Sequence, residues 1–158
     1  MDKYILSVIV QNNAGVLARI SSLFGRRGYN IDSLTVSATT NPRISRITIV
    51  VTGDDTILEQ IIKQVSKLEE AISVAHLHED DAHCRELVFV KICEPDADTR
   101  ESAREVAEVY GAHVVQAKDD TMLLELTEVP SRIDAFLSVI ANFHVIETCR
   151  SGVTAMNY

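Results

Sequence analysis

The sequence has little cysteine, few aromatic residues and no long apolar run. Its three cysteines, Cys84, Cys93 and Cys149, are widely separated and form no C-x-x-C pair, which excludes a zinc knuckle or a dithiol redox motif. We expect these thiols to be reduced and buried. Aromatic residues make up only 5% of the chain. The sequence therefore has no strand with the aromatic cluster on which an RNA-recognition module stacks bases.

Positive charge is also scarce. Fifteen Lys and Arg residues stand against 23 Asp and Glu residues, giving a formal net charge of −8. Nucleic-acid affinity depends on cations that neutralise phosphates, so this balance favours small molecules or proteins as partners. No apolar run approaches the roughly 20 residues that span a bilayer, and the start of the chain does not resemble a signal peptide. We therefore expect a cytoplasmic protein with no nucleic-acid or membrane partner.

Hydrophobic residues are plentiful, at 46% of the 158 residues, and their spacing predicts the secondary structure. Alternation predicts strands, and repeats at i, i+3 or i+4 and i+7 predict helices. The first half is predicted to contain a strand, a helix that ends near Gly25 or Gly28, a hairpin with an Asn41-Pro42 turn, a second helix and a last strand. The expected ranges are 3–11, 15–28, 29–39, 44–52, 54–68 and 71–78.

The same order recurs in the second half with little sequence identity. β-α-β-β-α-β is the ferredoxin-like arrangement, in which two helices cover one face of a four-stranded antiparallel sheet. We therefore expect an α+β protein with domains at 1–78 and 85–158 and a linker at 79–84. The expected ranges in the second half are 85–93, 98–111, 112–118, 121–127, 130–143 and 144–150. Pairs with helix-start spacing are Thr56 and Glu59, Asp98 and Glu101, and Ser131 and Asp134.

The stretch NNAGVL, residues 12–17, lies between the first expected strand and the first expected helix. A helix N-terminus has unpaired N–H groups and a partial positive charge, so it can bind a carboxylate. Gly15 lets a ligand approach the backbone, and Asn12 or Asn13 can accept a hydrogen bond from an ammonium group. Such a loop suits a free amino acid. In the structural alternative Asn13 only caps the helix and Gly15 relieves a tight turn.

Longer stretches resemble a known family. Residues 6–36, LSVIVQNNAGVLARISSLFGRRGYNIDSLTV, and SRITI at 45–49 are similar to the start of the regulatory, or small, subunit of acetolactate synthase. The most specific part is GYNIDSLTV. The similarity continues through LEQIIKQVSKL (58–68), RELVFVKI (85–92) and RSGV (150–153). The resemblance implies an N-terminal ACT domain, of the amino-acid-sensing kind, and a C-terminal ACT-like domain.

The resemblance also implies how such a chain works. Two ACT sheets would join edge to edge in a homodimer, and valine would bind between the protomers. The chain would bind and activate the catalytic subunit of acetolactate synthase and confer feedback inhibition in the biosynthesis of valine, leucine and isoleucine. Thiamine diphosphate, Mg²⁺ and FAD would belong to that catalytic chain, while this chain would have no catalytic or metal site. The implied effector residues are Asn12, Gly15, Val16 and Leu17 of one protomer and Asn30 and Ile31 of the other. The alternative function is a stand-alone tandem ACT sensor that acts on another enzyme or pathway.

Three further features have structural alternatives. HLHEDDAHC, residues 76–84, suits a metal site, but a solvated interdomain linker is the expected role. Arg26 and Arg27 could bind phosphate or serve as cations at a helix C-terminus, and GRRG matches no nucleotide motif. His113 and His144 lie on expected strands. Because no motif pairs a nucleophile with a base, we expect no intrinsic catalysis.

Overall fold

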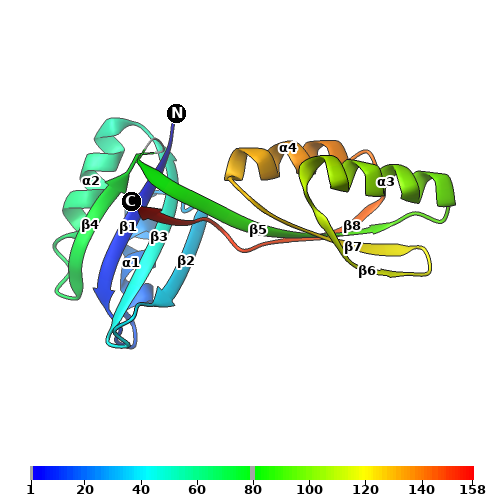
Figure 1. The fold of residues 1–158 in the computed structure, drawn as a ribbon. Coiled ribbons are helices and arrows are strands. Elements are labelled where there is room, and N and C mark those ends of the chain that lie inside the picture. Colours follow the sequence, from blue (N-terminus) through cyan, green and yellow to red (C-terminus); the bar gives the residue numbers. More distant parts are fainter. Residues whose placement is uncertain (1, 79–80) are drawn as a thin grey trace. The chain divides into compact units, whose positions relative to one another are not determined.

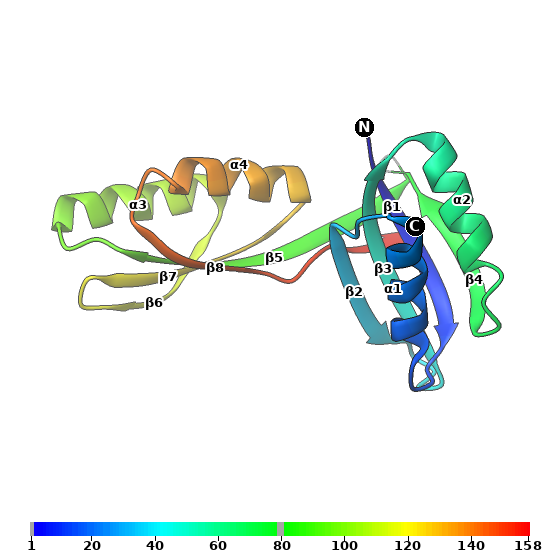
Figure 2. The same cartoon turned by 180° about the vertical axis from the view of Figure 1, so that it is seen from behind.

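The computed structural model describes residues 2–78 and 81–158, and the chain divides into two compact units. Unit 1 comprises Met1–Cys84 and Val153–Tyr158, and unit 2 comprises Arg85–Gly152. In each unit two helices cover one face of an antiparallel sheet (Figure 1; seen from behind in Figure 2). The α+β class and the two βαββαβ units expected from the sequence are confirmed.

Unit 1 has the strand order β2-β3-β1-β4. Alternation along the first strand turns Leu6 and Val8 toward the helices, where they are buried in one cluster with Ile20 and Phe24 of the first helix. Burying each such side chain stabilises the fold by about 1.5–3 kcal/mol. The elements are β1 (Asp2–Gln11), α1 (Val16–Arg27), β2 (Ser33–Ala38), β3 (Ile44–Gly53), α2 (Asp55–Val65) and β4 (Ala71–Leu77).

Unit 2 repeats this topology with the strand order β6-β7-β5-β8. Its core is formed by alternate residues of the sheet, such as Val90 and Leu124, packed with Ala103 of its first helix and Phe136 of its second. The elements are β5 (Ala82–Cys93), α3 (Ala97–Tyr110), β6 (His113–Lys118), β7 (Thr121–Glu128), α4 (Pro130–Ile140) and β8 (Val145–Arg150).

Two predicted capping residues are wrong by two positions, although the predicted helix ranges begin within one residue of α2 and α3. The N-cap of α2 is Asp54 rather than Thr56, and its carboxylate accepts a hydrogen bond from the backbone N of Ile57 at 2.9 Å. The N-cap of α3 is Asp96 rather than Asp98, and it accepts one from the backbone N of Thr99 at 2.8 Å. In both cases an upstream Asp reaches the first-turn amides, so the downstream pair does not act as a cap.

The capping pair expected for α4 is also wrong. Pro130 stands at the first helical position as predicted, but no side chain caps the helix. Asp134 instead accepts a hydrogen bond from Arg150 at 2.7 Å. An ion pair with an arginine distant in sequence is not visible in the local spacing.

The last strand, β9 (Thr154–Asn157), was not predicted. It pairs with β5, and Val153 and Ala155 are buried in unit 1 beside Ile5 and Val50. Ile5 on β1 and Val50 on β3 point away from the helices, because each alternates with helix-facing residues of its own strand. The C-terminal segment therefore covers apolar side chains on the helix-free face of the sheet.

The division into units differs from the expected domains at two places. Residues 153–158 belong to unit 1 rather than to the second domain, because Val153 and Ala155 complete its helix-free face. Residues 82–84 were expected in the linker but form the start of β5, with Cys84 buried. Glu79 and Asp80 of the expected linker lie outside the described residues.

The cysteines differ from one another in exposure. Cys84 is buried as expected, Cys93 is half-buried, and Cys149 is exposed, so the predicted burial of Cys149 is wrong. Cys149 lies on β8, an edge strand of unit 2 that pairs on one side with β5.

Across the described residues, no helix has the length and apolar content needed to cross a membrane.

Candidate functional site

The loop between β1 and α1 is tied to the turn between β2 and β3. The backbone N of Asn12 donates to the carbonyl O of Arg43 at 2.8 Å, and Asn12 Nδ2 donates to the carbonyl O of Pro42 at 2.9 Å. Asn13 does not cap the helix, because its Nδ2 donates to Gln11 Oε1 at 3.1 Å. The structural alternative in which Asn13 is the N-cap is therefore wrong.

Gly15 is the N-cap of α1. Its φ of 85° lies in the left-handed region that favours glycine. In the described chain no side chain caps the first turn, and that turn holds no acidic residue. A Cβ added at Gly15 would meet no atom within 4 Å. The start of α1 thus presents backbone N–H groups and the positive end of the helix dipole to open space.

The next two residues of the predicted site have different environments. The Val16 side chain is 5% exposed and belongs to the core, so only its backbone could face a ligand. That backbone N donates to the carbonyl O of Asn13 at 3.4 Å. Leu17 is 42% exposed and offers an apolar side chain beside the helix start.

Asn30 and Ile31 follow the other end of α1, which closes at Gly28 with a φ of 72°. Asn30 is exposed, and its Nδ2 donates to Asp32 Oδ1 at 3.0 Å. Ile31 is half-buried against the core of unit 1. The segment before β2 therefore exposes the oriented side-chain amide of Asn30 and part of the Ile31 side chain to solvent.

The six predicted residues form two groups at opposite ends of α1. The helix has 12 residues, so its ends are about 18 Å apart. A single amino acid cannot reach both Gly15 and Asn30 of one chain. The structure brings Asn12, Val16 and Leu17 together with Gly15, and Asn30 together with Ile31. Within one chain the two groups therefore do not form a common site.

The histidine-rich stretch does not form a metal cluster in the part that the structure describes. Among residues 2–78 and 81–158, no three His, Cys, Asp or Glu side chains are grouped closely enough to hold a metal ion. The ring centroids of His76 and His78 are 4.2 Å apart. Burial lowers the pKa of His76, and the neighbouring His78 lowers it further.

The hydroxyl of Tyr4 donates a hydrogen bond to Asp55 Oδ1 at 2.8 Å, and this bond is the main reason why the pKa of Tyr4 rises to about 12.

The remaining candidates lie apart from this site. Arg26 and Arg27 occupy the last turn of α1 and are exposed, as expected for cations that favour a helix C-terminus. His113 is exposed on β6, whereas His144 precedes β8, so its predicted strand position is wrong by one residue. The backbone N of His144 donates to Glu94 Oε1 at 2.6 Å.

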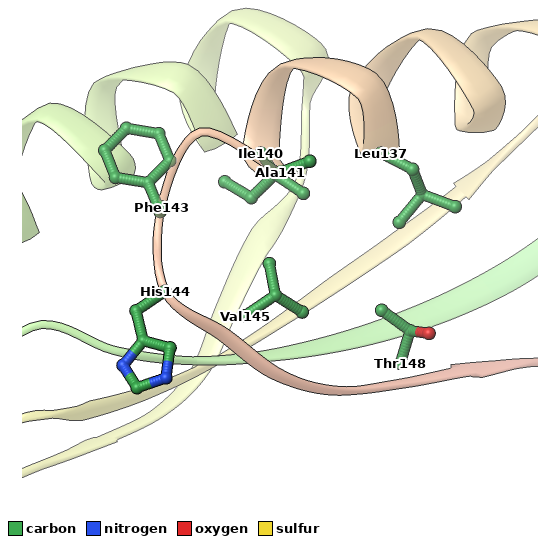
Figure 3. Close-up of a pocket in the computed structure, with 7 residues that line it drawn as sticks. All are labelled: Leu137, Ile140, Ala141, Phe143, His144, Val145 and Thr148. Atoms are coloured by element: carbon green, nitrogen blue, oxygen red, sulfur yellow. The ribbon is translucent and has the colours of Figure 1, made fainter.

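One hollow in unit 2, of about 440 Å³, lies between α4 and β8 (Figure 3). Its lining is mostly aliphatic and aromatic, and it includes Leu137, Ile140 and Val145. The His144 ring and the Thr148 hydroxyl lie at opposite ends of the group (Figure 3). The lining therefore brings no nucleophile next to a base, and the hollow does not resemble a catalytic site.

Both units have the βαββαβ topology that ACT domains share, and the first unit has an uncapped glycine at the start of its first helix. A family model described as the AHAS small subunit-like ACT domain matches residues 6–73, and one described as the small subunit of acetolactate synthase matches residues 85–158. The chain belongs to the family of acetolactate synthase small subunits.

Similar proteins agree with this assignment over nearly the full chain. The chain is 38% identical to the probable acetolactate synthase small subunit of Methanothermobacter thermautotrophicus over 99% of this chain and 93% of that one. It is 41% identical to the acetolactate synthase small subunit of Mycolicibacterium smegmatis over 96% and 89%. The crystal structure of the acetolactate synthase small subunit of Thermotoga maritima matches with a TM-score of 0.89 and 30% identity, over 100% of this chain and 98% of that one.

Proposed function

We propose that this chain is a non-catalytic regulatory subunit in the cytoplasm that binds the catalytic subunit of acetolactate synthase, raises its activity and confers feedback inhibition by valine. The observation that carries the proposal is the uncapped start of α1 at Gly15 in a chain of the small-subunit family. The backbone N–H groups there suit the carboxylate of an amino acid. The asparagines near both ends of α1 suit its polar groups, and Ile31 suits an apolar side chain.

A homodimer joined through β2 would complete the site. β2 is an edge strand of unit 1, and the segment containing Asn30 and Ile31 leads directly into it. The turn after β2 contacts Asn12 through Pro42. If two β2 strands pair antiparallel about a two-fold axis, the start of one meets the end of the other. Asn30 of one protomer would then lie opposite the Asn12–Gly15 loop of its partner.

The lengths of the two elements agree with this arrangement. The six residues of β2 span about 20 Å at roughly 3.3 Å per residue, close to the roughly 18 Å of α1. A two-fold pairing would therefore form two equivalent sites, each with one helix start and one Asn30–Ile31 segment.

Feedback inhibition requires that valine bind one arrangement of the holoenzyme better than another, since equal affinity shifts no equilibrium. A coupling free energy of about 1–3 kcal/mol would be ordinary. We place the thiamine diphosphate, Mg²⁺ and FAD chemistry in the catalytic subunit. This chain would supply the effector site and the contact that transmits its occupancy.

The test is reconstitution. The chain is purified, mixed with the acetolactate synthase catalytic subunit of the same organism and assayed with and without L-valine. We expect a stoichiometric complex, higher activity than that of the catalytic subunit alone, and inhibition by valine. The absence of a complex, together with saturable valine binding by the chain alone, would favour a stand-alone tandem ACT sensor instead.

A further inference from the structure

Asp32 lies in the GYNIDSLTV stretch and has no role in the site as described so far. Its two carboxylate oxygens bind two different side chains. Oδ1 accepts a hydrogen bond from Asn30 Nδ2 at 3.0 Å, and Oδ2 accepts one from Thr52 Oγ1 at 2.6 Å. Its backbone N donates to the carbonyl O of Val50 at 2.9 Å. Asp32 is thus held by β3 and in turn holds the side-chain amide of Asn30.

This contact determines which face of the Asn30 amide is available. A carboxylate accepts hydrogen bonds and cannot donate them, so the NH₂ group of Asn30 must face Asp32. The carbonyl oxygen Oδ1 then points to the other side of the amide. The described residues donate no hydrogen bond to that oxygen. Asn30 therefore presents a polarised acceptor to solvent.

Asn12 is oriented in the same sense by a different partner. Its Nδ2 donates to the carbonyl O of Pro42, which also can only accept. The described residues offer no donor to Asn12 Oδ1 either. Both asparagines of the candidate site thus present oxygens, whereas the start of α1 presents N–H groups. Together, the acceptor oxygens and the donor N–H groups match an ammonium and a carboxylate.

We propose that Asp32 is a positioning residue that makes the effector site select an α-amino acid over the 2-oxo acid with the same carbon skeleton. This inference rests on the proposed function. An ammonium group has three donors for the oriented oxygens, while the keto oxygen of a 2-oxo acid is another acceptor and would face Asn30 Oδ1 unpaired. A site built around a ligand donor rejects an analogue that lacks it.

Without the Asp32 carboxylate the Asn30 amide can turn over and present its NH₂ group. That orientation suits a keto oxygen, so the discrimination against the 2-oxo acid becomes smaller. The same change weakens binding of the amino acid, because the acceptor is no longer held in place and the negative charge near the ammonium is lost.

The experiment is a calorimetric titration of the full chain with L-valine and with 3-methyl-2-oxobutanoate. The variants are Asp32→Ala, Asp32→Asn and Glu105→Ala, the last removing an exposed acid of α3 in unit 2 as a charge-matched control. We expect the unaltered chain to bind valine at least about 100-fold more tightly than the oxo acid. We expect Asp32→Ala to lower this ratio of valine affinity to oxo-acid affinity about tenfold. Asp32→Asn keeps most of it, because the new amide oxygen can still accept from Asn30. Glu105→Ala leaves it unchanged.

Each other outcome overturns a particular statement. If Asp32→Ala binds both ligands as the unaltered chain does, the positioning role is wrong and the proposed function stands. If Asp32→Asn and Asp32→Ala lose the ratio equally, Asp32 acts through its charge rather than by positioning Asn30. If the unaltered chain binds no valine, both this inference and the effector part of the proposed function are wrong. Should Asp32→Ala fail to fold, Thr52→Val is used instead. It removes the hydrogen bond that Thr52 donates to Asp32, and we expect a smaller decrease in the affinity ratio.

Discussion

The two units share one topology but begin their first helices in opposite ways. α1 starts at Gly15 without a side-chain cap. At the start of α3, Asp96 accepts hydrogen bonds from Thr99 N at 2.8 Å and Thr99 Oγ1 at 2.7 Å. The guanidinium of Arg100 donates to the carbonyl O of Glu94 at 2.6 Å. In unit 2 the chain itself supplies an anion at the helix start, whereas unit 1 supplies none, so the shared topology does not fix how the first helix begins.

The largest expected effect comes from giving unit 1 the carboxylate that unit 2 already has. Gly15→Asp places a negative charge at the open start of α1, where it caps the helix and repels the effector's carboxylate. We expect valine affinity to fall about 100-fold, measured by calorimetry, and inhibition of the reconstituted enzyme to disappear. Binding to the catalytic subunit should persist.

Gly15→Asn is the matched control. Both replacements put a side chain at a φ of 85°, where Asn and Asp are the most tolerated residues. They differ by one charge. Gly15→Asn is therefore expected to keep most of the valine affinity. An equal loss in both variants would show that space or backbone strain, rather than charge, determines binding at this position.

Much of the fold could be predicted because it follows from local periodicity. The alternation in β1 and the apolar stripe of α1 each bury one face, and their types were predicted correctly. The capping residue of α3 was wrong because two acids, Asp96 and Asp98, lie near the helix start and the spacing does not say which one reaches the amides. β9 was missed because a strand of four residues carries too short a pattern. The C-terminal segment is held in place by apolar residues distant in sequence, such as Ile5 and Val50, against which Val153 and Ala155 are buried.

The site was predictable in part, and for a different reason. Gly15 and Asn12 could be proposed from the sequence because a glycine and an asparagine before a helix have a known chemistry at its N-terminus. Asn30 came only from the family resemblance, since nothing in its own spacing indicates a ligand. Asp32 and Pro42 were missed as partners of these asparagines, because a hydrogen bond that orients an amide becomes visible only when both of its ends have been placed.

Glu86 is a buried charged residue of unit 2. Its side chain is 4% exposed and receives two hydrogen bonds from Arg150, at 2.8 and 2.6 Å. In Glu86→Gln an NH₂ group faces the guanidinium, so one bond is lost and a buried donor is left unpaired. We expect unit 2 to lose about 2–3 kcal/mol of unfolding free energy, measured by hydrogen exchange of the β5 and β8 amides.

Asp134→Asn is the control for that variant. Asp134 also binds Arg150, but its side chain is 50% exposed, so the expected loss is below about 1 kcal/mol. Hydrogen exchange of the unit 1 amides should not change in either variant. A similar loss for both substitutions would mean that the arginine, and not the burial of Glu86, determines the cost.

A somewhat smaller effect is expected for the C-terminal segment of unit 1. Val153 is 5% exposed, and its backbone binds the side chains of Ser33 and Thr35 on β2 at 2.9 and 2.8 Å. Val153→Ala keeps those bonds and removes only buried methyl groups, so we expect unit 1 to lose about 2 kcal/mol. Met156→Ala, at a side chain that is 60% exposed, should change stability by less than about 0.5 kcal/mol. Equal effects would show that the segment is not packed on the sheet.

The smallest effect returns to the start of α3. The hydrogen bonds from Thr99 lower the pKa of Asp96, so the folded state favours the ionised carboxylate. Its contribution to stability is therefore complete above the unfolded pKa of about 3.9 and is lost as the pH falls through the lower folded value. Asp96→Ala should lower the thermal midpoint of unit 2 at neutral pH, and the difference from the unaltered chain should shrink below about pH 4. Because the proposed effector site lies in unit 1, we expect valine affinity not to change. A midpoint difference that is independent of pH would mean that Asp96 does not act at α3 as an ionised cap, and that the contrast between the two helix starts has another origin.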